Sequence, residues 1–163
     1  MGSLDHFKTV STYTDTTFSD VSGWYAGYVE TCYELGLFSG TGTGRFSPDA
    51  SMTAAEAVKL AACLHSIYET GSADFVQSDP WWQVYADYCL ENSIMEDAFH
   101  DYSNAISRAQ FAVLLAAALP DEVLSEMNAI ADEAIPDVHV SDSYGPAVYK
   151  LYRAGIFTGT DST

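Results

Sequence analysis

The chain has 163 residues, of which 48% are hydrophobic and 13% aromatic, so it can bury a core and is not a disordered chain. Its 23 Asp and Glu against 6 Lys and Arg give a formal net charge of −17. This acidity excludes nucleic acid and anionic membrane surfaces as partners, because no basic field attracts phosphate. No apolar run is long enough for membrane insertion.

The first predicted element is an aromatic amphipathic helix over Gly23–Leu35, where apolar residues recur at spacings of three and four. Gly36 follows it, which predicts a left-handed turn at the helix end. The loop Gly42–Asp49 is rich in helix breakers. It leads to the capping box Thr53-Ala-Ala-Glu56, which predicts the start of a second helix.

The same order of elements returns farther along the chain. Trp81–Glu91 predicts another aromatic helix, and Ser107-Arg-Ala-Gln110 is a second capping box before an apolar run. A third aromatic helix is predicted over Tyr144–Arg153, followed by Gly155. Between these elements, Pro120–Glu133 is expected to form an acidic helix with one apolar face.

Two short motifs indicate internal repetition. Phe18-Ser-Asp-Val21 recurs as Ile135-Pro-Asp-Val138. Gly36-Leu-Phe-Ser-Gly-Thr41 recurs as Gly155-Ile-Phe-Thr-Gly-Thr160. The third copy reaches no capping box before Thr163, so it is expected to supply only the first half of a unit.

The cysteines and histidines indicate neither a disulfide framework nor a metal site. The chain has an odd number of cysteines, Cys32, Cys63 and Cys89, and no two of them have Cys-x-x-Cys spacing. Cys32 and Cys89 each lie eight residues after a tryptophan and are predicted to be buried and unpaired. No histidine has metal-ligand spacing with another histidine or cysteine. We therefore expect no metal and no cofactor.

Catalytic motifs are missing from the sequence. It contains no Gly-x-Ser-x-Gly elbow and no P-loop. The carboxylates are scattered over loops and predicted exposed positions, as is typical of a solvated acidic surface. The chain is therefore not expected to be an enzyme, and no catalytic residue is assigned.

The first copy resembles the S-layer homology (SLH) module, and five of its segments carry the likeness: Phe18-Ser-Asp-Val21, Trp24-Tyr25, Gly36-Leu-Phe-Ser-Gly40, Gly44-Arg-Phe-Ser-Pro-Asp49 and Thr53-Ala-Ala-Glu56. The second copy keeps Trp81-Trp82 and Ile106–Phe111, and the third keeps its first half. The resemblance implies three tandem modules, and we place them as follows: residues 15–70, 71–120 and 135–163, with 1–14 as a lead-in segment and 121–134 as an acidic connecting helix.

The resemblance also implies a fold and a function. The fold would be all-α and pseudo-threefold, with the first helices in a central three-helix bundle and the loops and second helices projecting as prongs. The function would be non-covalent anchoring of a secreted bacterial surface protein to the cell wall. The ligand would be a secondary cell-wall polysaccharide, often bearing pyruvate ketals, held in grooves between modules.

In the family, the arginine of a Thr-Arg-Ala-Glu motif and residues near the first-helix aromatic line these grooves. Only Arg108 matches that arginine, because the first copy has Ala54 there. The candidate glycan-binding residues are Arg108, Trp81, Trp24, Asp20, Asp137, Gly40 and Gly159.

Several of these candidates have structural alternatives. The two aspartates are expected to cap their helices rather than contact sugar. The glycines suit special backbone conformations. Trp82 lies on the apolar stripe and is expected in the core, whereas Trp24 and Trp81 lie beside the stripe and are expected at a rim.

A second hypothesis is a degenerate module that has lost the glycan and mediates protein–protein contact. The third unit lacks an outer helix, so Asp121–Glu133 or His6–Tyr13 is expected to cover the gap. If the gap is uncovered, Tyr149, Tyr152 and Phe157 would form an exposed apolar patch that favours self-association.

Overall fold

A computed structural model describes residues 1–159, and its regular elements are helices. The α-helices are α1 (Ala26–Glu34), α2 (Ala54–Thr70), α3 (Gln83–Glu91), α4 (Arg108–Ala117) and α5 (Gly145–Arg153), and the short 3-10 helices are η1 (Leu4–His6) and η2 (Gly23–Tyr25). No strand occurs within residues 1–159. The predicted helical fold is confirmed, as are the three aromatic helices and both helices that follow a capping box.

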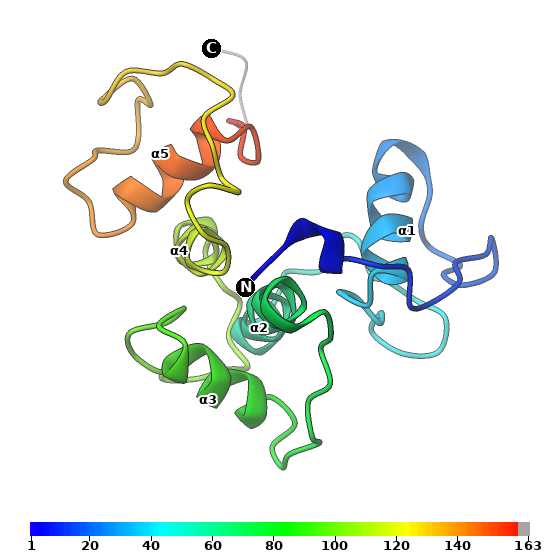
Figure 1. Cartoon of the computed structure of the whole chain (residues 1–163). Coiled ribbons are helices and arrows are strands. Elements are labelled where there is room, and N and C mark those ends of the chain that lie inside the picture. The colour runs from blue at the N-terminus through cyan, green and yellow to red at the C-terminus, as the bar shows by residue number, and fades with distance from the viewer. Residues whose placement is uncertain (160–163) are drawn as a thin grey trace.

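The centre of the molecule is formed by α2 and α4, which lie side by side with α1, α3 and α5 around them (Figure 1). Helix α2 packs against α3, α4 and η1, and α4 packs against α5. The implied central bundle of first helices is therefore wrong for this structure, since α1, α3 and α5 do not pack against one another. The physical reason lies in α2, whose alanines and other apolar residues are buried over much of its surface, as suits a central helix.

Both capping boxes form as the sequence predicts. The backbone N–H of Thr53 donates to the Glu56 carboxylate at 2.8 Å, and the Glu56 N–H donates to the Thr53 hydroxyl at 3.3 Å. Ser107 and Gln110 make the same two bonds at 3.0 and 3.2 Å. These bonds satisfy N–H groups that have no partner within the helix, and so fix where α2 and α4 begin.

The three aromatic helices end in the same way. Gly36, Ser93 and Gly155 follow them with φ of 76°, 58° and 73°, so the predicted left-handed glycine positions are confirmed. Two successive N–H groups then donate to one helix carbonyl: Leu37 and Phe38 to Cys32, Ile94 and Met95 to Cys89, and Ile156 and Phe157 to Leu151. This shared hydrogen-bond pattern relates the three helices as structural repeats. Thr160, the last residue of the third copy's motif, and the rest of that copy to Thr163 lie outside the described residues.

The acidic segment after α4 is not a helix, which corrects the expectation for residues 120–133. The backbone N–H groups of Met127 and Asn128 donate to the Arg153 carbonyl at 2.7 and 2.8 Å. In return, the Arg153 guanidinium donates to the Ile130 carbonyl at 3.1 Å and to Asp132 at 2.6 Å. The segment therefore wraps the end of α5: it bonds to that helix at Met127, Asn128 and Ile130, and its own backbone bonds are isolated turns such as Val123 to Pro120.

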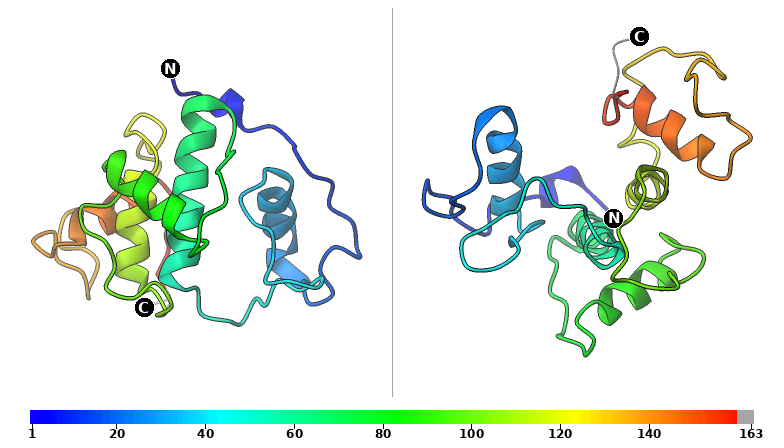
Figure 2. Two further views of the ribbon diagram at one scale, coloured as in Figure 1. Left: turned by 90° about the horizontal axis from the view of Figure 1, so that it is seen from below. Right: turned by 180° about the vertical axis from the view of Figure 1, so that it is seen from behind.

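The N-terminal segment holds α1 in the same manner. Val10 and Ser11 donate their N–H groups to the carbonyl of Glu34, the last residue of α1. Ser3 donates to the Tyr68 carbonyl near the end of α2. Residues 1–14 are therefore more than a lead-in, because they connect α1 to the central helix (Figure 2).

The core consists of two clusters. The larger joins α2 and α3 with the loops around them, and the smaller joins α4 and α5 with Leu124 from the segment before α5. Tyr149 is only 1% exposed, and its hydroxyl donates to the Val138 carbonyl and accepts from the Ile135 N–H. The expected exposed patch therefore does not include Tyr149, while Tyr152 and Phe157 are half-buried.

The cysteines are free, and their burial predicts their reactivity. Cys63 and Cys89 are buried, and this raises the pKa of their thiols to about 11 and about 12. Cys32 is half-buried, which falls short of the burial predicted for it. We expect a disulfide reagent at pH 8 to label Cys32 first, because the other two combine low access with almost no thiolate. Peptide mapping after native labelling checks this, and early labelling of Cys89 would contradict it.

The longest helix, α2, has 17 residues. Among residues 1–159 no helix has both the length and the apolar character required to span a membrane.

Candidate functional site: two pockets, each with one cation

The basic side chains fall into two groups. Arg45, Lys150 and Arg153 pair with carboxylates. Within residues 1–159, the other three of the six Lys and Arg make no such pair, and two of these, Lys59 and Arg108, each line a pocket. In a chain with 23 acidic residues, these two cations remain available to an anionic ligand.

Arg108 lies at the first position of α4 and lines a pocket of about 280 Å³. Its guanidinium donates to the Thr158 carbonyl at 3.2 Å and lies 5.4 Å from the centre of the Phe157 ring. Phe111, one turn along the helix, forms another wall, and Gly159 lies at the edge. The arrangement places a cation and two aromatic rings around one opening, between α4 and the loop after α5.

The start of α4 also differs from the start of α2. At α2, the N–H groups of Ala54 and Ala55 donate to the carbonyls of Asn104 and Tyr102 at 2.8 and 3.0 Å. The equivalent N–H groups of α4, at Arg108 and the residue after it, have no backbone or side-chain acceptor within residues 1–159. These groups add to the positive potential near the Arg108 side chain.

Ala54 holds the place in α2 that Arg108 holds in α4, and these contacts cover it. Ala54 is 2% exposed and lies under the segment that contains Asn104 and Tyr102. A long cationic side chain has no room in that place. Arg108 has no such cover and is exposed.

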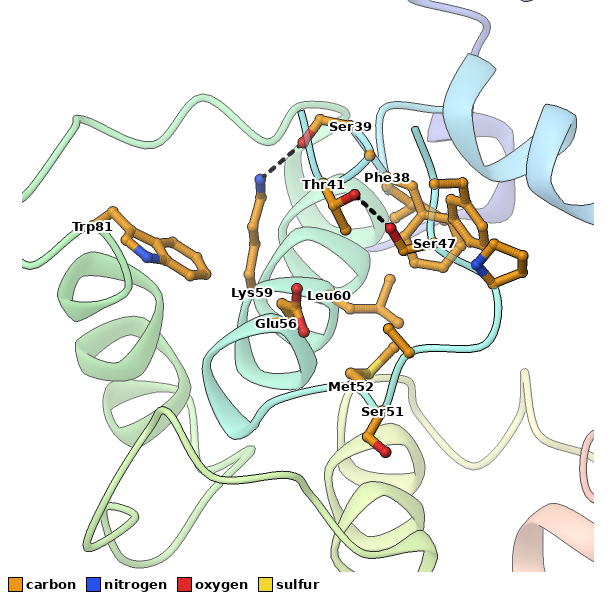
Figure 3. Close-up of a pocket in the computed structure, with 15 residues that line it drawn as sticks. Phe38, Ser39, Thr41, Ser47, Ser51, Met52, Glu56, Lys59, Leu60 and Trp81 are labelled. Atoms are coloured by element: carbon orange, nitrogen blue, oxygen red, sulfur yellow. Dashed lines mark hydrogen bonds between the residues drawn. The ribbon is translucent and has the colours of Figure 1, made fainter. Parts of the chain in front are cut away.

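Lys59 lies in a larger pocket, of about 510 Å³, between the loop of the first unit, α2 and the start of the second unit. Its ammonium donates to the Ser39 hydroxyl at 3.4 Å and lies 5.8 Å from the centre of the Tyr85 ring. Figure 3 shows Lys59 with Trp81 on one side and Phe38, Met52 and Leu60 on the other. The pocket is therefore mainly apolar, with one cation near its rim.

The tryptophans occupy the positions expected of them. Trp82 is half-buried and stacks on Tyr102 with 4.0 Å between ring centres. Trp81 is 45% exposed and Trp24 is 85% exposed, so both lie at the surface. The structure does not bring them together with Arg108, because Trp81 and Gly40 line the Lys59 pocket and Trp24 lies beside Tyr28 at the start of α1.

Asp20 does not cap a helix, contrary to the expectation. Its carboxylate accepts the backbone N–H groups of Phe46 and Ser47 at 2.8 and 2.9 Å and lies 3.6 Å from Nε of Arg45. It therefore fixes the loop after α1, and no helix-capping bond is made at η2. Asp137, its counterpart in the third unit, is exposed and has no hydrogen-bond or ion-pair partner within residues 1–159.

The Asp20 interaction predicts a pH-dependent stability. The Phe46 N–H, followed by the other bonds, holds the pKa of Asp20 below the usual aspartate value. Its stabilisation is therefore complete above the unfolded-state pKa and is lost as the pH falls through the lower folded-state pKa. We expect Asp20→Asn to lower the melting temperature at pH 7 and to make little difference near pH 2. Asp137→Asn is the matched control, and an equal pH-dependent loss in both variants would contradict the assignment.

Sequence reasoning missed Lys59, Phe111 and Phe157 as lining residues. Nothing in the local sequence marks these residues as pocket residues, because their placement depends on which loop packs against which helix. The one available signal was the scarcity of cations. Each Lys or Arg in so acidic a chain has many carboxylates to pair with, so a cation that lacks such a partner is a candidate ligand-binding residue.

Residues 1–159 contain no group of three or more His, Cys, Asp or Glu that could hold a metal ion. The fold and the pockets define a class of protein: a helical module in which three helices share one type of C-terminal turn and two pockets open on the surface. Residues 17–58, from the segment before η2 into α2, match the family model of the S-layer homology domain. This match indicates a general role in anchoring at cell walls and cell surfaces. No curated protein matches the chain.

Proposed function

We propose that this protein anchors a bacterial surface protein by binding an anionic secondary cell-wall polysaccharide in the Arg108 pocket. The match to the S-layer homology domain supports the general role. The observation that carries the proposal is the Arg108 guanidinium beside Phe157, which has no carboxylate partner within residues 1–159, next to the N–H groups at the start of α4 that have no acceptor in the same range. A guanidinium binds a carboxylate through two parallel hydrogen bonds, and aromatic rings pack on sugar faces.

The carboxylate that we propose for this pocket is a pyruvate ketal on the sugar. The net charge of −17 repels such a polymer at long range, so the local groups must supply the attraction. Free helix N–H groups are suited to this, because they point at an anion and need no other partner. Gly159 and Phe111 complete the proposed contact surface.

The proposal extends to the organisation of the chain. We infer three modules, at residues 15–70, 71–120 and 135–163, because the three aromatic helices end in the same hydrogen-bond pattern. We infer that the protein is secreted, since its ligand lies in the cell wall. Trp24 and Tyr28 are 85% and 69% exposed, and we propose them as an additional platform for sugar or for self-association.

A sedimentation assay with purified sacculi tests the proposed function. We expect the protein to co-sediment with sacculi that keep their secondary polymer and to stay in solution after that polymer is extracted. Equal binding to both preparations, or to neither, would contradict glycan anchoring. The second outcome would favour the alternative of a protein-interaction module.

A further inference from the structure

The Lys59 pocket has few free polar atoms for its size. The hydroxyls of Thr41 and Ser47 lie 2.9 Å apart and bond to each other, and the Glu56 carboxylate is held by Thr53 at 2.8 Å. The Lys59 ammonium and the Ser39 hydroxyl lie together at one edge, and the Ser51 hydroxyl lies apart from them. A sugar ring carries hydroxyl groups around its whole edge, and this pocket cannot pair most of them.

The rest of the lining is suited to an apolar group. Phe38, Met52, Leu60 and Trp81 face the cavity from both sides of Lys59 (Figure 3). The volume of about 510 Å³ lies within the range of roughly 300–1,000 Å³ that is typical of ligand pockets. The pocket therefore matches a ligand that has one negative charge next to a bulky apolar group.

We propose that this pocket binds the C-terminal residue of a peptide chain, with its carboxylate on Lys59 and its apolar side chain between Phe38, Met52 and Leu60. A terminal residue carries the charge and the apolar group on the same carbon. The carboxylate of an internal Asp or Glu has no apolar group beside it and would leave the walls empty. The Arg108 pocket shares no lining residue with this one, so the inference does not depend on glycan binding.

Charge complementarity at short range favours this ligand despite the acidity of the whole chain. Lys59 has no carboxylate partner within residues 1–159, and one oxygen of the nearby Glu56 carboxylate, Oε2, accepts both the N–H and the hydroxyl of Thr53 in the α2 capping box. At 0.15 M salt the screening length is about 8 Å, so distant carboxylates act weakly and the contact with Lys59 dominates. A charge-assisted hydrogen bond beside apolar walls is stronger than a neutral one.

The test is a titration of the ¹⁵N-labelled protein, followed by NMR, with N-acetyl-leucine and with its amide. We expect the acid to bind about tenfold more tightly than the amide and to shift the indole N–H signal of Trp81. Lys59→Met should remove the difference between acid and amide. The matched control is Lys8→Met, since Lys8 also has no carboxylate partner within the described residues but lines neither pocket, and it should keep the difference.

Three results would overturn the proposal. Equal affinity for acid and amide in the unmodified protein would show that Lys59 does not select a carboxylate, and this comparison decides the matter even if Lys59→Met fails to fold. Binding of glucuronate in place of N-acetyl-leucine would assign the pocket to a sugar. Acid binding that survives Lys59→Met but is lost in Arg108→Gln would place the ligand in the other pocket.

Discussion

Gly40→Ala is expected to destabilise the first unit by about 3 kcal/mol, the sum of backbone strain and a steric collision. Gly40 has a φ of 77°, in the region that side chains rarely adopt. A Cβ at this position would collide with the Phe18 ring and lie 2.7 Å from the Arg45 carbonyl oxygen. Phe18 is 5% exposed and packs against Tyr33 with 5.4 Å between ring centres, so it cannot move aside without loss of packing.

The measurement is thermal unfolding followed by circular dichroism. For a domain of this size, we expect the melting temperature to fall by roughly 10 °C. Gly23→Ala is the matched control, because Gly23 has a similar φ of 80° but no atom within 4 Å of the added Cβ. It should lose only about 1 kcal/mol from backbone strain. Similar losses in the two variants would contradict the steric part of this explanation.

The local elements of this fold could be predicted from the sequence because each depends on neighbouring residues. The capping boxes at Thr53 and Ser107 and the left-handed positions at Gly36 and Gly155 form where the sequence places them. The hydrogen bonds involved connect residues only a few positions apart.

The errors arose where distant contacts decide the conformation. Residues 120–133 have a helical pattern, but the N–H groups of Met127 and Asn128 bond to the carbonyl of Arg153, more than twenty residues later in the chain. Asp20 has the spacing of a helix cap, but the loop amides of Phe46 and Ser47 occupy its carboxylate. Local propensity cannot anticipate such partners, because it contains no information on which segments meet.

The candidate site was predictable only in part, because the sequence shows local motifs but not which distant segments pack together. Arg108 could be selected from its motif alone, and the structure places it in a pocket with Gly159. Trp81 and Gly40 could be selected as well, but they lie in the Lys59 pocket, apart from Arg108. Which candidates share a pocket depends on the packing of α2 and α4 at the centre, which the sequence pattern did not predict.

Arg108→Gln is expected to weaken binding to the wall polysaccharide by one to two decades, if the proposed function holds. The change removes a charged hydrogen bond worth about 1.5–3 kcal/mol, and each 1.4 kcal/mol is a factor of about ten in affinity. Arg108→Lys should restore only part of the affinity, because an ammonium keeps the charge but not the two parallel donors.

The fold should tolerate the change at Arg108. The side chain is exposed, and within residues 1–159 it bonds to the Thr158 carbonyl and approaches Phe157. Exposed contacts of this kind contribute only about 1 kcal/mol or less, so the melting temperature should fall by a few degrees at most. A loss of wall binding therefore cannot be attributed to unfolding.

The control for long-range charge is Lys8→Gln, which makes the same change in net charge away from both pockets. Binding isotherms with solubilised secondary polymer at 0.15 M salt should be unchanged in this variant. An equal loss of binding in both variants would mean that overall charge, and not the paired N–H donors of the Arg108 guanidinium, governs attachment. Unchanged binding in Arg108→Gln would show that the glycan does not bind in this pocket, because no other guanidinium lines it.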